Sequence, residues 1–293
     1  WDIDVHREKI LKKEFQPSRE LLVFDEIHKF KRWRNYLKGI VDAIKVDEFP
    51  NRQILVTGSA KLDYYRFGGD SLQGRYFYYR LLPLSFKEIG AHGPQDLKSL
   101  FHLGGFPEPF FKQSEKFARK WSLEYTRRLF KEDISTLERI EDLSSMELLV
   151  YRLPELVGSP LSINALREDL QVAHATAAKW IQVLERLYLV FRISPFGDSS
   201  IKAVKKEQKL YFMNWAVIEN EAARFENMVA AHLLKYACWR EDVDGVRTEL
   251  RYFRMRDGRE VDFILLENSK PILAVECKFS DDSVNPLLYS LKE

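Results

Sequence analysis

A short apolar run that ends in two acids constrains the fold of this chain more than any other feature of its sequence. Leu21 to Phe24 are apolar, and Asp25 and Glu26 follow them directly. Four apolar residues are too few for a buried helix, so the run predicts a buried parallel strand whose C-terminal end carries carboxylates. Open α/β sheets bind their ligands at that end of the strands. The chain is therefore predicted to be an α/β protein with a ligand site beside Asp25.

The order of the two acids indicates their chemistry. In P-loop ATPases, the first carboxylate holds Mg²⁺ through water and the second orients the water that attacks the γ-phosphate. Asp25 and Glu26 occupy these positions, which predicts ATP and Mg²⁺ as cofactors, Asp25 as a metal-binding residue and Glu26 as a catalytic residue. Asp-Glu pairs also end ordinary strands, so the pair alone leaves a purely structural role open.

A second apolar run ends in small hydroxyl residues. Gln53 to Val56 are followed by Thr57, Gly58 and Ser59. A Thr or Ser at the tip of a strand beside Asp25 could hydrogen-bond the water or the phosphate, which is the polar sensor role in AAA+ ATPases. Thr57 and Ser59 are therefore predicted to contact the nucleotide.

Two further segments, Ser71–Arg75 and Leu82–Ile89, complete an ordered set. With the two strands, they resemble a bacterial and archaeal family of AAA+ ATPases that carries a C-terminal domain of unknown function with a restriction-endonuclease-like fold. The resemblance covers nearly the whole chain. It implies a parallel AAA+ sheet, a helical lid, a winged helix and a nuclease-like domain, with copies of the chain assembling through the AAA+ part.

The phosphate-binding loop of such an ATPase is missing from the sequence. The loop needs the pattern Gly-x-x-x-x-Gly-Lys-Ser/Thr, and in AAA+ order it precedes the acidic strand. Only twenty residues precede Leu21, and none of them match. The nearest imitation, Gly69 to Tyr76, follows the strand and has Arg75 where Lys is required. Since the chain begins with Trp rather than Met, we expect it to be part of a longer protein and to bind ATP poorly by itself.

Arg75 and His28 each have two interpretations. An Arg at a subunit edge can reach a neighbour's γ-phosphate and stabilise the transition state, which would make Arg75 catalytic. Arg75 could equally be a structural residue that caps a strand between Tyr76 and Tyr79. His28 completes an Asp-Glu-x-His segment of the kind found in helicases, but the other helicase signatures are missing, so we interpret it as a surface histidine.

Composition limits the compartment and the partners. Cys238 and Cys277 are the only cysteines, which fits a reducing cytoplasm and gives no disulfide framework or zinc site. No apolar run approaches the roughly 18 residues of a membrane helix, so no membrane partner is expected. The 46 basic and 44 acidic residues nearly cancel, so a nucleic-acid surface must be local. We expect a cytoplasmic protein.

The middle of the chain is predicted to be helical. Residues 97–149 have a helical pattern that Gly104 and Gly105 interrupt, and the resemblance makes this part the lid. A helix at Ile163–Leu170 capped by Ser162, a turn, a second helix and an extended segment to Phe196 then resemble a winged helix.

The second helix of this motif is the candidate for DNA recognition. Four of its residues are expected to face outward and to enter a major groove: His174, Thr176, Lys179 and Gln182. Winged helices also bind proteins, and an excess of only three cations over residues 151–210 leaves DNA and a protein partner both open.

The last eighty residues carry a second set of acids. Asp262 lies on one predicted strand and Glu276 and Lys278 on the next, Pro271–Lys278, a spacing that resembles the PD-(D/E)XK nuclease signature. Glu226, on a preceding amphipathic helix, matches the helix acid that often accompanies this signature. Asp262 and Glu276 are predicted to share a Mg²⁺ with Glu226, and Lys278 to position the attacking water. A salt-bridged cluster without catalysis is the alternative.

These observations predict four segments and two functions. The segments are an AAA+ core (1–95), a lid (96–150), a winged helix (151–210) and a nuclease-like domain (211–293). The first function is an ATP-hydrolysing protein that acts on DNA with a nuclease-like domain. The second is an ATP-regulated module that binds DNA or protein through an inactive nuclease fold.

Overall fold

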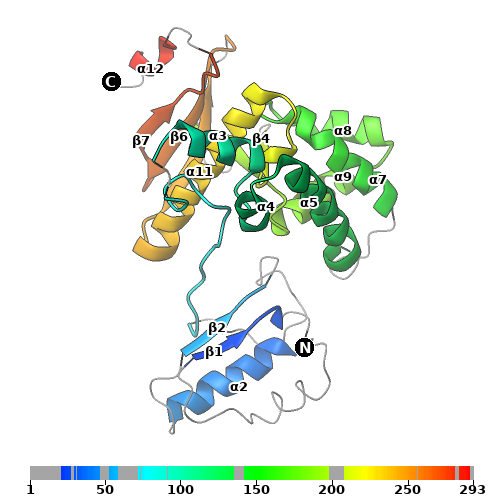
Figure 1. Ribbon diagram of the computed structural model, residues 1–293, viewed down its shortest axis with the longest axis vertical. Coiled ribbons are helices and arrows are strands. Elements are labelled where there is room, and N and C mark those ends of the chain that lie inside the picture. Colours follow the sequence, from blue (N-terminus) through cyan, green and yellow to red (C-terminus); the bar gives the residue numbers. More distant parts are fainter. Residues whose placement is uncertain are drawn as a thin grey trace. The chain divides into compact units, whose positions relative to one another are not determined.

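The computed structural model divides into two compact units, Trp1–Phe77 and Tyr78–Glu293 (Figure 1). The four predicted segments remain a prediction, because the contacts within the structure separate the chain only once, before residue 78. His28 and Ser59 lie outside the residues that the structure describes. Those residues are 21–27, 30, 32–46, 53–58, 72, 74–90, 92–134, 142–197, 208–255, 257–280 and 284–290.

The first unit is built on two parallel strands. β1 (Leu21–Phe24) pairs in parallel with β2 (Gln53–Val56), and both strands have the predicted bounds. The helix α2 (Trp33–Val46) packs against them. The core consists of Phe24, Ile27, Trp33, Leu37 and Ile40.

One face of this small sheet is open. The expectation of a strand buried on both faces is wrong for the described residues, since Leu21, Val23 and Leu55 are 52%, 55% and 51% exposed. The side chains of a strand alternate between the two faces of the sheet. The other two side chains of β1 face the core that α2 contributes to, where Phe24 is buried and Leu22 packs against it.

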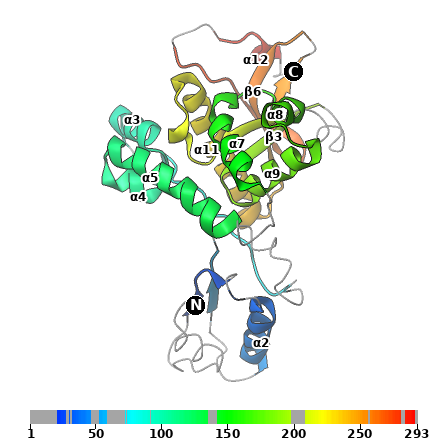
Figure 2. The same cartoon turned by 90° about the vertical axis from the view of Figure 1, so that its right-hand side faces the viewer.

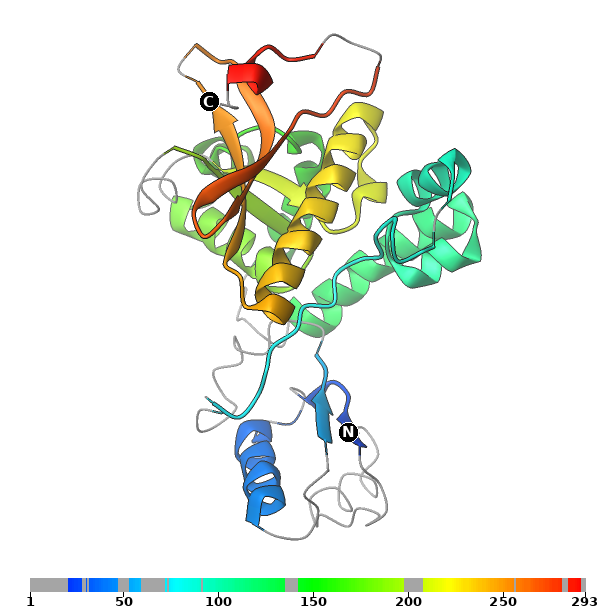
Figure 3. The same cartoon turned by 90° about the vertical axis from the view of Figure 1, so that its left-hand side faces the viewer.

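The first helices of the second unit form a group that stands to one side of the sheet (Figure 2 and Figure 3). It contains α3 (Pro94–Leu103), α4 (Pro107–Lys112), α5 (Glu115–Arg128) and the π-helical turn η3 (Leu129–Ile134). The predicted interruption lies between α3 and α4. A side chain at Gly105 would meet Trp215 at 2.5 Å, so this close approach requires glycine.

A second helical group follows the first. It contains α7 (Leu143–Arg152), η4 (Leu153–Leu156), α8 (Ile163–Leu170) and α9 (His174–Arg186). The predicted bounds and cap of α8 are confirmed, because the Ser162 side chain accepts the amide of Ala165 at 3.3 Å.

A five-stranded sheet with the order β4-β3-β5-β6-β7 forms the centre of this unit. β3 is antiparallel to β4 and parallel to β5, and the remaining neighbours are antiparallel. The long helix α11 (Glu221–Asp244) packs against the sheet (Figure 3). The other elements are β3 (Val190–Pro195), β4 (Lys209–Phe212), η5 (Trp215–Val217), β5 (Thr248–Arg254), β6 (Glu260–Glu267), β7 (Lys270–Val275) and α12 (Leu287–Ser290).

The ribbon of the predicted winged helix is part of this sheet. Helix, turn, helix and antiparallel ribbon do occur in the predicted order, but Ser194 and Pro195 of β3 pair with Arg251 and Tyr252 of β5. β4 also spans the predicted boundary at residue 210. Since β3 and β4 are almost entirely buried, a free β3 edge would leave buried peptide groups without partners, and β5 supplies them.

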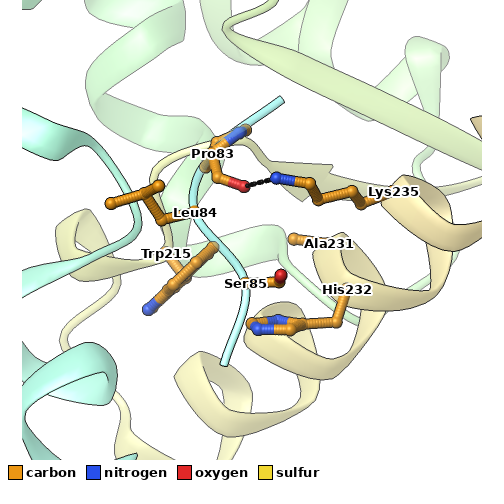
Figure 4. A pocket seen from close by; sticks show the side chains of 7 residues that line it. All are labelled: Pro83, Leu84, Ser85, Trp215, Ala231, His232 and Lys235. Atoms are coloured by element: carbon orange, nitrogen blue, oxygen red, sulfur yellow. Dashed lines mark hydrogen bonds between the residues drawn. The ribbon is translucent and has the colours of Figure 1, made fainter. Parts of the chain in front are cut away.

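An extended segment, residues 78–90, crosses α11 and is called the strap below. Arg80 donates to both carboxylate oxygens of Asp242, at 3.0 and 2.7 Å. Lys235 donates to the Pro83 carbonyl at 2.8 Å (Figure 4). His232 accepts the Phe86 amide through Nε2 at 3.1 Å, and burial lowers the pKa of this imidazole. These contacts fix the start of the second unit on its longest helix.

None of the helices that the structure describes combines the length and apolar character of a membrane span.

Candidate functional site

The two strand tips of the first unit meet through one hydroxyl group. The Thr57 hydroxyl donates to Asp25 Oδ1, and its oxygen accepts the Glu26 amide at 3.3 Å. Parallel pairing of β1 and β2 places Thr57 beside Asp25, and the Thr57 amide continues the pairing by donating to the Phe24 carbonyl at 2.9 Å. One side chain therefore holds both predicted ATPase acids at the sheet edge where ligands bind.

Two details refine the predicted roles at this edge. Thr57 gives its hydroxyl proton to Asp25, so in this structure it positions the acid and does not offer that proton to a phosphate. Glu26 adopts a left-handed backbone with φ of 52°, which for a residue other than glycine costs about 1 kcal/mol. Such local strain is typical of functional sites.

Arg75 contacts its own unit. Its guanidinium lies 3.2 Å from Asp42 Oδ1 on α2, and the two side chains are 29% and 47% exposed. The neighbouring Tyr76 and Tyr79 are exposed. The contact with Asp42 is the kind expected of a structural arginine, and the half-exposed pair is weak enough to break if another partner approaches.

In the second unit, Asp262 and Glu276 lie on facing positions. β6 and β7 pair Phe263 with Val275, so the next residues outward, Asp262 and Glu276, are opposite each other and project to the same face. The predicted strand to Lys278 ends earlier, at Val275. The Cys277 amide donates to Asp262 Oδ2 at 2.7 Å instead of continuing the sheet.

Lys278 and one orphaned oxygen complete this edge. Lys278 Nζ lies 3.2 Å from Glu276 Oε1. The other oxygen, Glu276 Oε2, is buried and has no hydrogen-bond partner among the described residues. A buried carboxylate oxygen without a donor is unfavourable unless something else satisfies it.

Glu226 is engaged by two residues that sequence patterns missed. Tyr211 donates to Glu226 Oε1 at 2.8 Å, and Lys209 Nζ lies 3.8 Å from the same atom. Lys209 is 1% exposed and also donates to Glu260 Oε1 at 2.9 Å. A Lys at the start of an apolar strand gives no sign in the sequence that it is buried. Only the fold brings Lys209 to Glu226 and Glu260.

The surroundings of Asp262 favour its protonated form. Burial, with the nearby charges of Glu226 and Glu276, raises the pKa of Asp262 to about 6, although the Cys277 amide and Lys209 act in the opposite direction. Burial and the Glu226 charge likewise raise the pKa of Tyr211. Asp262 therefore binds a proton more readily than a solvent-exposed aspartate does.

The fit of this site to Mg²⁺ is partial. Among the described residues, no three His, Cys, Asp or Glu side chains are arranged to hold a metal ion together. The predicted three-acid set fails at Glu226, whose Oε1 is already engaged by Tyr211 and Lys209. Asp262 and Glu276 do fit, because they are hard oxygen donors and Glu276 Oε2 lacks a partner.

The predicted DNA-recognition residues lie on α9 as expected. His174, Lys179 and Gln182 are exposed and Thr176 is partly exposed. The opposite face of the helix is buried, with Ala177, Trp180, Ile181, Val183 and Leu184 in the core. Their placement permits contact with a partner and does not identify it.

Comparison with known proteins bears first on the β1 and β2 edge. Residues 2–90 match an AAA domain. This match contains Asp25, Glu26 and Thr57, and it supports a nucleotide-hydrolysing function for that region. Residues 94–223 match a domain of unknown function (DUF8612), and residues 222–293 match another (DUF4143). No solved structure matches the chain.

The relatives are themselves without assigned function. The uncharacterized protein MJ1544 of Methanocaldococcus jannaschii is 23% identical over 87% of this chain and 60% of its own length. MJ1637 of the same organism is 26% identical over 73% of this chain and 48% of its own length. The uncharacterized protein Rv2008c of Mycobacterium tuberculosis is 23% identical over 68% and 43%. The chain thus spans about half the length of these relatives.

Proposed function

We propose that this chain is part of a protein that hydrolyses ATP and acts on DNA, with a metal-dependent phosphodiester-cleaving site in its second unit. The observation that carries the ATPase half is the contact of Thr57 with Asp25 and Glu26 at adjacent tips of parallel strands, within a region that matches an AAA domain. The DNA half rests on the facing acids Asp262 and Glu276.

At the first edge, each residue has a separate task. Asp25 would hold Mg²⁺ through water, and the ion when bound neutralises phosphate charge. Thr57 keeps the Asp25 carboxylate fixed, and the Glu26 carboxylate orients the attacking water. Arg75 would act on nucleotide only after leaving Asp42, so its role depends on a conformational change or a neighbouring copy.

At the second edge, Asp262 and Glu276 would hold a divalent cation, which when bound supplies hydroxide and stabilises the departing oxygen. Lys278 would position the attacking water and offset charge that develops on the phosphate. Lys209 reduces the repulsion between Glu226 and Glu260, because its ammonium group contacts both. The burial of this edge strengthens each of these electrostatic contacts.

Lys278→Ala tests the cleavage half. Incubating the full-length protein with plasmid and Mg²⁺ or Mn²⁺ should give nicked or linear DNA, and the variant should be slower by roughly 10²-fold, since a lost charge-stabilising donor has about that effect. Arg259→Ala is the matched control, because Arg259 is an exposed cation paired with Asp257. Equal cleavage by wild type and Lys278→Ala would overturn this half.

A second candidate function is an ATP-regulated binding module in which the nuclease-like site is inactive. It is favoured by the engagement of Glu226 with Lys209 and Tyr211, which removes one predicted metal ligand. In that case plasmid would remain intact with both ions while ATP turnover persists.

A further inference from the structure

The most cationic helix of the second unit is not the predicted recognition helix. α5 carries five Lys and Arg residues against two Glu residues, a net charge of +3, whereas the whole chain carries only +2. α8 and α9 together carry three Lys and Arg against three Asp and Glu residues. Because phosphate contacts supply most of the non-specific affinity for DNA, α8 and α9 lack the charge that such binding needs.

The cations of α5 gather on one face. With 3.6 residues per turn, four of them fall within an arc of about 100° and extend over about 16 Å of the helix: Lys116, Arg119, Lys120 and Arg127. All four are exposed, whereas Ala118 on the opposite side is buried and Trp121 and Tyr125 are half-buried. These four residues are called the α5 cationic face.

Little holds these cations in place. Arg119 lies 3.5 Å from Glu115 and Arg127 lies 2.9 Å from Glu124, both as exposed pairs within the helix. Among the described residues, Lys116 and Lys120 have no ion-pair partner. Exposed ion pairs within a helix are weak, so a phosphate backbone can replace Glu115 and Glu124 at small cost.

The support beneath the face is rigid. Trp121 stacks on Tyr125 with ring centroids 5.1 Å apart and donates to Glu108 at 2.7 Å. Ser114 caps the helix by accepting the Phe117 amide at 3.3 Å. A capped helix that presents four exposed cations on one face can contact several phosphates of a nucleic-acid backbone.

We propose that the α5 cationic face binds the phosphate backbone of duplex DNA and supplies most of the affinity of this chain for it. This inference rests on the proposed action on DNA and assigns the backbone contacts to α5. Side chains on α9 would then at most read bases. Three lost phosphate contacts should lower the slope of log K against log salt by about 3 and weaken binding by roughly 10²-fold at moderate salt.

The test is fluorescence anisotropy of a labelled duplex from about 50 to 200 mM salt. Lys116→Gln/Lys120→Gln/Arg127→Gln should show the loss of slope and affinity. Lys87→Gln/Lys98→Gln/Arg167→Gln, which removes two exposed cations and one partly exposed cation outside α5, should keep both. Circular dichroism checks that each variant is folded.

Three results would overturn the inference, and they have different meanings. If wild type binds the duplex and the α5 variant binds equally well, the α5 cationic face does not bind the DNA backbone, while the proposed action on DNA stands. If wild type does not bind duplex at any salt concentration, the proposed action on DNA fails as well. If the α5 variant loses more affinity for an RNA duplex than for the DNA duplex, the α5 cationic face binds RNA rather than DNA.

Discussion

Glu26→Gln in the full-length protein is expected to retain ATP binding and to lose ATP turnover by roughly 10²-fold or more. Gln has the size of Glu and preserves the backbone contact to Thr57, but it cannot accept a proton from the attacking water or orient it equally well. Steady-state phosphate release measures turnover, and equilibrium binding of a fluorescent ATP analogue measures affinity. The two measurements together separate a chemical defect from a binding defect.

Thr57→Val provides the comparison for this prediction. It removes the hydroxyl that holds Asp25 and the Glu26 amide while keeping the shape of the side chain. We expect a smaller loss of turnover, about tenfold. Mg²⁺ should also bind more weakly, because Asp25 loses its fixed orientation. Unchanged turnover in Glu26→Gln would remove the role assigned to Glu26, whatever Thr57→Val does.

Lys209→Met should destabilise the second unit by about 2–3 kcal/mol. Lys209 is 1% exposed and contacts both Glu226 and Glu260. Among the described residues, its loss leaves Glu226 with only the Tyr211 hydroxyl and Glu260 with the more distant Arg254. Because those carboxylates are 20% and 32% exposed, water reduces the penalty below that of a fully buried pair. Urea denaturation followed by tryptophan fluorescence and circular dichroism measures the change.

A double-variant cycle makes the Lys209 prediction specific. Lys209→Met/Glu260→Gln removes one of the opposing charges as well, so it should recover part of the lost stability. Arg152→Met is the matched control, since Arg152 is an exposed cation paired with Glu155 and should change stability by less than about 0.5 kcal/mol. A loss below 1 kcal/mol in Lys209→Met would contradict the charge balance described for this site.

Local sequence patterns predicted individual elements well. The bounds of β1, β2 and α8 were correct, and Asp262 lies on a strand, β6, as predicted. Apolar runs, alternation and a Ser cap act within a few residues, so they can be read along the chain. Trp33, Leu37 and Ile40 recur at helical spacing in the sequence, and all three lie in the core of the first unit.

The errors concern partners that are distant in sequence. Pairing of β3 with β5 joins residues 194 and 251, and no local pattern marks that edge. Burial of Lys209 depends on Tyr252 and Glu260, which lie on two other strands. The engagement of Glu226 by Tyr211 follows from how α11 packs on β4. The sequence therefore predicted Glu226, Asp262 and Glu276 as one set of acids, but it did not predict that Lys209 pairs with Glu226.

The most direct test of the account is calorimetric titration of Mn²⁺ into the full-length protein, because both proposed activities require acids at a sheet edge to bind a divalent cation. We expect a binding event that Asp262→Asn abolishes and Asp25→Asn preserves when nucleotide is absent. Affinity should rise as the pH increases through about 6, since the cation needs the ionised form of Asp262, whose pKa lies there. Heats that are identical in wild type and Asp262→Asn would contradict the account.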